Sequence, residues 1–168
     1  QDRLEYAQLV GVDVEEVPSK RGYSYPQIID AIDKGEIKAL WIVATNPLVS
    51  FPNQEKLRRA FAKLELLVVQ DAFKSETALS ADVVFSAATW SEKEGTYTNS
   101  ERRCNYAKKA VEPLGNTKSD FDIVLEFSKY FEGQNERLFN NWTQPRDAFS
   151  EWKKVSKGRL CDYSGMSY

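Results

Sequence analysis

The run ALWIVA, residues 39–44, narrows the possible folds of this chain more than any other feature. It is apolar throughout, as expected for a strand buried on both faces of a parallel sheet, whereas a half-exposed strand alternates. The run stops at Thr45, Asn46 and Pro47, a turn in which Pro47 holds Asn46 in an extended conformation. Ligands of open α/β sheets lie at the carboxyl ends of such strands, so we expect Asn46 at a ligand-binding edge. For an Asn-Pro pair taken alone, a turn that binds nothing is the commoner interpretation.

Apolar strands alternate with amphipathic helices over the first half of the chain. The expected strands are residues 40–43, 66–69 and 82–87, and the expected helices are residues 26–34, 54–63 and 74–81. Connections this short make a right-handed series of parallel strands. The predicted fold class is therefore α/β, a Rossmann-like three-layer domain with a mainly parallel sheet flanked by helices. Gln70 and Asp71 end the second strand and should lie beside Asn46 on one rim of the sheet.

The remaining segments predict a single α/β domain over residues 1–168, with less regular flanks at residues 1–24 and 134–168. Residues 10–17, VGVDVEEV, have a β-like alternation. Two later helices are expected, one over residues 121–131 that Gly133 ends and one over residues 145–156. Ser119 or Asp120 caps the first of these, and a cap needs no ligand to explain it. Because the chain begins without Met and ends in turn residues, we expect it to be a piece of a longer protein.

Composition argues against several functional classes. The chain has no histidine, which removes the commonest general base and the commonest ligand of transition metals. Its two cysteines form no CxxC pair, so we expect no zinc site or disulfide framework, a reducing compartment, and a small buried side chain at Cys104. A net charge of -2 gives no support for nucleic acid or a membrane surface as a partner. The glycine-rich fingerprints of nicotinamide, flavin and nucleoside-triphosphate sites are also missing.

The block WSEKEGTYTNSERR, residues 90–103, is the densest polar stretch. A solvated loop or hairpin is the usual interpretation of such a block. Its turn residues and the adjacent guanidinium groups of Arg102 and Arg103 are also well suited to holding a phosphate or a carboxylate.

Residues 35–103 resemble a segment of the molybdopterin oxidoreductases, especially their nitrate reductases and formate dehydrogenases. The resemblance rests on GEIKALWIVATNP, LLVVQDAFKSETALSADVV and ATWSEKEGTYTNSERR in succession, and it continues through residues 115–121. The tail AFSEWKKVSKGRLCDYSGMSY favours the assimilatory nitrate reductase branch. In this family the region is an α/β domain that helps bind one of two molybdopterin guanine dinucleotide groups on molybdenum.

Position by position, the resemblance implies that the dinucleotide contacts Asn46, Gln70, Asp71, Lys93 and Asp120. It further implies a cytoplasmic oxidoreductase that reduces nitrate to nitrite with molybdenum-bis(molybdopterin guanine dinucleotide). The iron–sulfur cluster of such an enzyme would lie outside this chain, which carries no catalytic or metal-binding residue and should be inactive alone. The implied partners are the remaining domains of the parent enzyme and an electron donor such as ferredoxin, flavodoxin or an NADH-linked reductase subunit.

Three alternatives stay open from the sequence. A formate dehydrogenase segment would share these motifs, because the residues that distinguish the two reactions lie around the metal. A non-catalytic α/β interaction domain would keep the scaffold without the ligand. A free-standing binder of small nucleotides is disfavoured by the missing glycine-rich turn.

Overall fold

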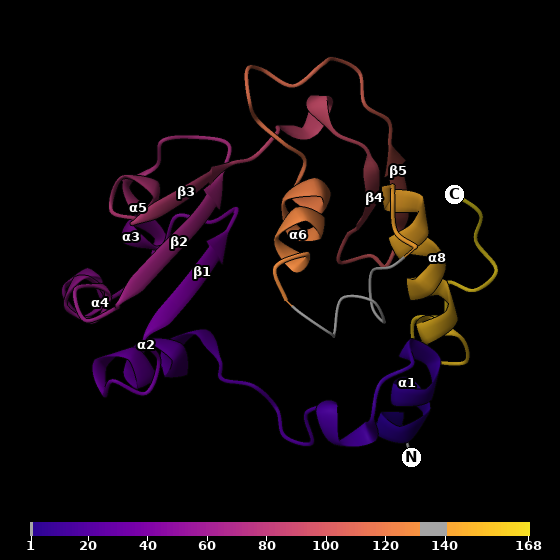
Figure 1. Cartoon of the computed structure of the whole chain (residues 1–168), viewed down its shortest axis with the longest axis horizontal. Coiled ribbons are helices and arrows are strands. Elements are labelled where there is room, and N and C mark those ends of the chain that lie inside the picture. The colour runs from indigo at the N-terminus through magenta and orange to yellow at the C-terminus, as the bar shows by residue number, and fades with distance from the viewer. Residues whose placement is uncertain (1, 132–140) are drawn as a thin grey trace. The chain divides into compact units, whose positions relative to one another are not determined.

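The computed structural model describes residues 2–131 and 141–168 of the chain (Figure 1). In chain order its elements are α1 (Asp2–Val10), η1 (Val14–Glu16), α2 (Tyr25–Asp33), β1 (Ala39–Val43), α3 (Pro47–Ser50), α4 (Gln54–Phe61), β2 (Leu66–Asp71), α5 (Glu76–Leu79), β3 (Val83–Ser86), η2 (Trp90–Glu92), β4 (Gly95–Thr98), β5 (Cys104–Ala107), α6 (Asp120–Ser128) and α8 (Pro145–Ser156).

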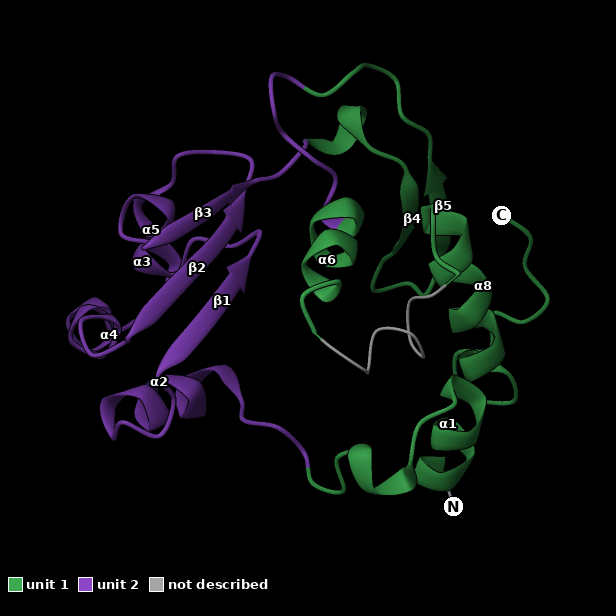
Figure 2. Ribbon diagram, in the orientation of Figure 1, with its two compact units in different colours: residues 1–20, 89–113, 121–168 green, residues 21–88, 114–120 purple. Residues whose placement is uncertain are grey.

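The chain divides into two compact units, coloured separately in Figure 2. Unit 2 comprises residues 21–88 and 114–120, and unit 1 comprises the described parts of residues 1–20, 89–113 and 121–168. The chain crosses between the units four times, so neither unit is one continuous segment. That residues 1–168 act as one domain of a larger enzyme stays a prediction.

The sheet of unit 2 confirms the predicted α/β class. Its three strands are parallel in the order β1-β2-β3, with Val43 beside Gln70 and Asp71 beside Ser86. The predicted strand at residues 82–87 is slightly shorter in the structure, where β3 ends at Ser86. Because all three strands run the same way, their carboxyl ends meet at one edge.

One face of this sheet packs against helices. Leu40, Ile42, Leu67 and Val69 point to that face because side chains two residues apart share a side of a strand. They join a core that includes the following side chains of α2, α3, α4 and α5: Ile29, Ile32, Leu48, Leu57, Ala60 and Ala78. Helices α2 and α4 begin within one residue of their predicted starts, since Pro26 lies in the first turn of α2 and Asn53 accepts a hydrogen bond from Lys56 N–H at 3.0 Å. The helix predicted over residues 74–81 is shorter in the structure, where α5 spans Glu76–Leu79.

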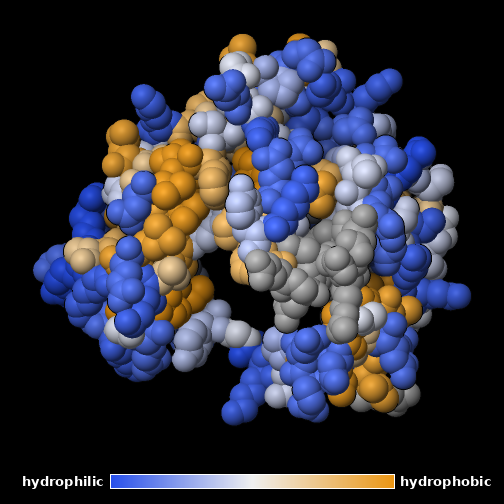
Figure 3. All heavy atoms as spheres, in the orientation of Figure 1, coloured by the Kyte–Doolittle hydropathy of each residue, from blue (hydrophilic) through white to orange (hydrophobic). Residues whose placement is uncertain are grey.

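The opposite face of the sheet is also apolar, but parts of it remain exposed. Val43 is 48% exposed, and Leu66 and Val83 are each 39% exposed. Near the middle of this face the rings of Trp41 and Phe85 lie 5.5 Å apart. Figure 3 shows hydrophobic residues gathered over the strands of unit 2.

Unit 1 contains an antiparallel hairpin and a set of packed aromatic rings. The polar block predicted as a loop or hairpin is a hairpin, in which β4 pairs with β5 and Gly95 lies opposite Ala107. Trp90 stacks on Tyr97 with ring centroids 4.0 Å apart. Trp152 of α8 stacks on Tyr163 at 4.1 Å. Aromatic pairs of this kind supply stability beyond the area they bury.

Several local predictions are wrong. Residues 10–17 form no strand: α1 ends at Val10, Gly11 has a φ of +74°, and the Asp13 capping box starts the short helix η1. Helix α6 ends at Ser128, three residues earlier than predicted, and Gly133, its predicted stop, lies outside the described residues. Cys104 is partly exposed instead of buried.

None of the helices in the described part of the chain is both long and apolar enough to cross a bilayer.

Candidate functional site

The loops that leave β1, β2 and β3 form one rim of unit 2. Ala44 N–H donates to Gln70 O at 2.9 Å, and Ala87 N–H donates to Asp71 O at 3.0 Å, so the strand ends are joined as predicted. Ala44 has a φ of +53°, a left-handed conformation that is uncommon for a residue with a Cβ. Strained residues of this kind are concentrated in ligand-binding segments.

A segment from much later in the chain brings Asp120 to the same rim. Lys118 N–H donates to Ser86 O at 3.1 Å, and Lys118 O accepts from Ala88 N–H at 2.8 Å, so this segment continues the sheet beside the end of β3. Two residues later Asp120 begins α6. Its Oδ1 accepts a hydrogen bond of 2.6 Å from Gln70 Nε2. The structure thus joins two of the predicted site residues directly across 50 positions of sequence.

The Gln70 side chain is fully buried at this rim. Its Nε2 is bound to Asp120, but its Oε1 has no hydrogen-bond partner within residues 2–131 and 141–168. A buried carbonyl oxygen without a donor costs about 1 to 3 kcal/mol, so native proteins rarely leave one incomplete. An N–H or O–H group from a ligand or an ordered water would complete it.

The side chain of Asn46 is hydrogen-bonded to α5. Its Oδ1 accepts hydrogen bonds from Thr77 Oγ1 at 2.7 Å and from Thr77 N–H at 3.2 Å. Its Nδ2 donates to Glu76 Oε2 at 2.7 Å. This hydrogen bond is the largest cause that lowers the pKa of Glu76, and a hydrogen bond to the backbone is the next largest. Asn46 therefore connects the end of β1 to α5, and one of its two amide hydrogens is already committed to the protein.

Asp71 holds the loop between β2 and α5. Its Oδ1 accepts from Phe73 N–H at 3.1 Å, and its Oδ2 accepts from Ser75 Oγ at 2.9 Å. Ser75 in turn caps α5 by accepting from Ala78 N–H at 3.3 Å. Each carboxylate oxygen can accept a further hydrogen bond, so Asp71 keeps the capacity to bind a donor from a ligand.

Lys93, the fifth predicted residue, belongs to unit 1. It follows η2 and directly precedes Glu94 and the hairpin strand β4, and it is half-buried. Four of the five predicted residues, Asn46, Gln70, Asp71 and Asp120, therefore share the rim of unit 2. The convergence of Lys93 with these four stays a prediction.

The sequence interpretation missed the residues that hold the predicted site together, namely Ser75, Glu76 and Thr77. Ser75 followed by Glu76 is a helix-start pattern, which could have been recognised as the cap of α5. No sequence signal indicated that Thr77 would be fully buried and bound to Asn46.

The chemistry available at the rim is hydrogen bonding and negative charge. Among the described residues no group of three or more His, Cys, Asp or Glu side chains is placed to hold a metal ion. The carboxylates of Asp71 and Asp120 and the carbonyl oxygen of Gln70 are acceptors. They match a ligand that presents several N–H groups along one edge, as a guanine base does with its ring N–H and exocyclic amino group.

The chain is similar to several known proteins. The family model for molybdopterin oxidoreductases matches residues 4–130. The chain is 40% identical over 147 residues to the F420-dependent formate dehydrogenase subunit alpha of Methanocaldococcus jannaschii, covering 88% of this chain and 21% of that protein. It is 34% identical over 166 residues to the assimilatory nitrate reductase catalytic subunit of Bacillus subtilis, covering 99% of this chain and 23% of that protein.

A solved structure has the same fold. The acetylene hydratase from Pelobacter acetylenicus matches with a TM-score of 0.67 and 23% sequence identity, over 99% of this chain and 22% of that one. The chain thus spans about a fifth of the length of the curated relatives it matches.

Proposed function

The chain belongs to the molybdopterin oxidoreductase family, and from this premise we propose that it is the molybdopterin guanine dinucleotide-binding segment of a nitrate reductase. The complete enzyme would reduce nitrate to nitrite at molybdenum-bis(molybdopterin guanine dinucleotide). This segment would bind and orient one dinucleotide and would have no activity alone. When bound, the cofactor supplies the two-electron chemistry, and the protein supplies binding, orientation and electrostatics.

The observation that carries the proposal is the Gln70–Asp120 pair at the carboxyl ends of the strands. The fully buried Gln70 amide donates to the Asp120 carboxylate at 2.6 Å, and its own Oε1 has no donor among the residues that the structure describes. Guanine offers N–H groups that such acceptors prefer, and a carboxylate can take two of them at once. The residues present therefore fit the guanine end of the dinucleotide.

The other predicted residues take supporting roles in this proposal. Lys93 would hold the pyrophosphate, because an ammonium group on a flexible stem suits a phosphate oxygen. Asp71 would accept a further donor while it holds the loop before α5. Asn46 would donate its second amide hydrogen, since the first goes to Glu76.

The wider assignments belong to the same proposal. The parent enzyme would carry its iron–sulfur cluster outside this segment, would work in the cytoplasm in nitrate assimilation, and would take electrons from ferredoxin, flavodoxin or an NADH-linked subunit. The 34% identity with an assimilatory nitrate reductase over 99% of the chain supports the nitrate reductase branch, and the other points rest on the resemblance of the sequence to this family.

The test uses the complete enzyme with Lys93→Ala and Asp120→Ala, and with Lys74→Ala as a control that removes an exposed cation near the rim. Molybdenum and the GMP released by acid hydrolysis are measured per polypeptide, and melting temperature reports folding. Both test variants should lose molybdenum, GMP and nitrate reduction in parallel, while Lys74→Ala keeps all three. Full GMP content in both folded test variants would refute the proposal and favour a non-catalytic interaction domain.

A second candidate is a formate dehydrogenase, because the chain is 40% identical to the subunit of such an enzyme over 147 residues. The two readings share the dinucleotide site and differ in the reaction at the metal. Assays of the wild-type complete enzyme with nitrate and with formate separate them: oxidation of formate without reduction of nitrate would replace the first candidate by the second.

A further inference from the structure

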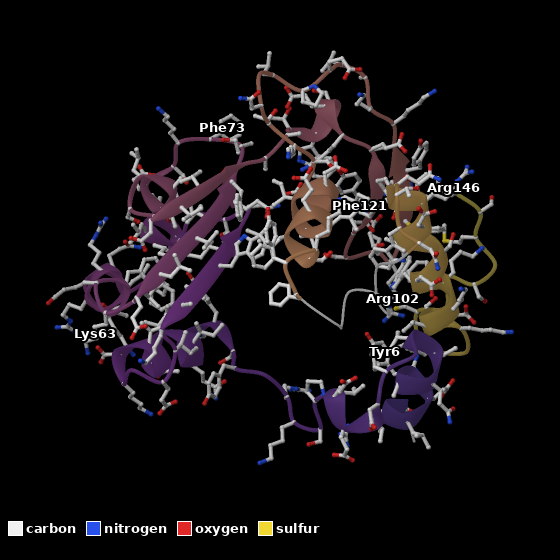
Figure 4. All side chains as sticks on the ribbon, in the orientation of Figure 1. Tyr6, Lys63, Phe73, Arg102, Phe121 and Arg146 are labelled. Atoms are coloured by element: carbon white, nitrogen blue, oxygen red, sulfur yellow. The ribbon has the colours of Figure 1, made fainter. Side chains whose placement is uncertain are left out.

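Phe73 is an exposed aromatic ring on the rim of unit 2, and the proposed function has not used it. Its side chain is 73% exposed. Figure 4 shows it on the segment that leaves β2, beyond the carboxyl end of that strand. Phe73 takes part in no ring contact among residues 2–131 and 141–168. Hydrophobic groups exposed singly are ordinary, so exposure alone does not indicate a function for Phe73.

The backbone of Phe73 is fixed on both sides, although its ring is exposed. Its N–H donates to Asp71 Oδ1 at 3.1 Å, and its carbonyl oxygen accepts from Ser75 N–H at 2.9 Å. Asp71 also accepts from Ser75 Oγ, which closes the loop around Phe73. A ring presented to solvent from a rigid loop loses little conformational freedom when it binds a flat partner, which favours affinity.

The groups next to Phe73 indicate which kind of ligand its ring would contact. Asp71, which holds the loop, is an acceptor for N–H groups, and Phe73 offers an aromatic face two residues later. A purine base needs both: acceptors along its edge and an aromatic surface against its plane. An aliphatic ligand would use only the ring, and a purely anionic ligand would use neither feature.

We propose that Phe73 stacks on the guanine base of the dinucleotide and that this stacking contributes to selection of a purine. The inference rests on the proposed function and adds a residue to it. Stacking of a base on an aromatic side chain is worth about 1 to 3 kcal/mol, which corresponds to a change of about 5- to 150-fold in dissociation constant. Asp71 positions Phe73 by holding its loop, in addition to accepting a donor from the ligand as proposed above.

The experiment titrates the complete enzyme, freed of its cofactor, with GDP and with CDP by calorimetry. GDP carries the base and two phosphates but no pterin, so it reports the guanine site alone. The variants are Phe73→Ala, Phe73→Leu and Phe73→Trp, with Leu79→Ala as a matched control because Leu79 of the same unit is 72% exposed.

Phe73→Ala and Phe73→Leu should weaken GDP binding at least fivefold and reduce the preference for GDP over CDP, while Phe73→Trp and Leu79→Ala should bind as the wild type does. Melting temperatures should stay unchanged, since the ring is exposed. GDP binding by Phe73→Leu equal to the wild type would overturn the inference, because any apolar side chain would then serve. Wild-type enzyme that binds no GDP would overturn the proposed function, whereas wild-type binding that Phe73→Ala leaves unchanged would overturn this inference alone.

Discussion

Replacing Thr77 by valine should loosen the rim of unit 2 without changing the shape of the core. Thr77 is fully buried, and its hydroxyl makes two hydrogen bonds. It donates to Asn46 Oδ1 at 2.7 Å and accepts from Leu48 N–H at 3.1 Å. Valine has nearly the same volume, so the change leaves no cavity but replaces the hydroxyl by a methyl group that cannot form hydrogen bonds.

The expected loss of stability depends on the hydrogen bonds that Leu48 and Asn46 keep after the substitution. Leu48 is only 5% exposed, so its N–H loses its acceptor in a place that water does not readily reach, at a cost of about 1 to 3 kcal/mol. Asn46 Oδ1 keeps the backbone N–H of Thr77 at 3.2 Å, so its loss is one neutral hydrogen bond, about 1 kcal/mol. The expected decrease in the free energy of unfolding is therefore about 2 to 4 kcal/mol.

Urea unfolding followed by far-UV circular dichroism measures this decrease, and hydrogen exchange of the β2 amides assigns it to unit 2. The transition midpoint should fall by about 1 to 2 M for an m-value typical of small proteins. Thr77→Ser should retain most of the stability because it keeps the hydroxyl. Thr45→Val is the matched control, since Thr45 is exposed, and its effect should stay within about 0.5 kcal/mol. A Thr77→Val variant as stable as the control would refute the reasoning.

Other predictions test the rim and the tail of unit 1. Gln70→Glu places a second carboxylate against Asp120, so the two carboxyl groups should share a proton and the pKa of the pair should rise. The free energy of unfolding should then fall by about 3 kcal/mol as pH rises from 4 to 7. A flat dependence of thermal unfolding on pH would contradict this. Hydrogen bonds from the side chain of Ser164 and from backbone N–H groups lower the pKa of Asp162 to about 2, so its contribution to stability is present above the unfolded value and is lost as pH falls towards 2. Asp162→Asn should thus lower the melting temperature at pH 7 and leave it unchanged below pH 2, while a decrease of equal size at both pH values would reject the assignment. Ala44→Val should destabilise by about 1 to 2 kcal/mol because a β-branched side chain resists the φ of +53°, and Ala44→Gly should change stability by less than about 0.5 kcal/mol; equal denaturation midpoints for the two variants would disprove strain at this position.

The strands of unit 2 were predictable because their apolar runs are short, uninterrupted and bounded by turns. A run such as residues 39–44 is too short for a complete helix, and its β-branched and aromatic residues favour a strand, so composition and length agreed on one structure. The expectation that this strand is buried on both faces was wrong for this chain, because Val43 is 48% exposed. The N-terminal segment misled the prediction because its signals conflict. Residues 10–17 alternate as a strand does, yet Gly11 at φ +74° ends α1 and Asp13 caps η1. Local capping and backbone conformation outweighed alternation there.

The candidate site was only partly predictable. Parallel strands place Asn46, Gln70 and Asp71 on one edge by topology alone, and the structure bears this out. The position of Asp120 depends on a bridge between Ala87 and Lys118, a pairing that no local pattern encodes. The resemblance to a known family supplied that residue, whereas physical reasoning from the residues alone favoured a simple helix cap.

The single turn of α5 explains how polar residues at two strand ends can both support the site. Asn46 is hydrogen-bonded to Glu76 and Thr77 of α5, and Asp71 is hydrogen-bonded to Ser75, which caps this helix. Because both loops are anchored to this helix, a displacement of α5 would move the acceptors of Asp71 and the ring of Phe73 together. Hydrogen bonds within the protein thus fix the side chains that are left to contact a ligand, so less conformational entropy is lost when the ligand binds. Much of the polar character at the rim serves this preorganisation, so substitutions of Glu76 or Thr77, the α5 residues that hold Asn46, should weaken nucleotide binding without removing a ligand contact.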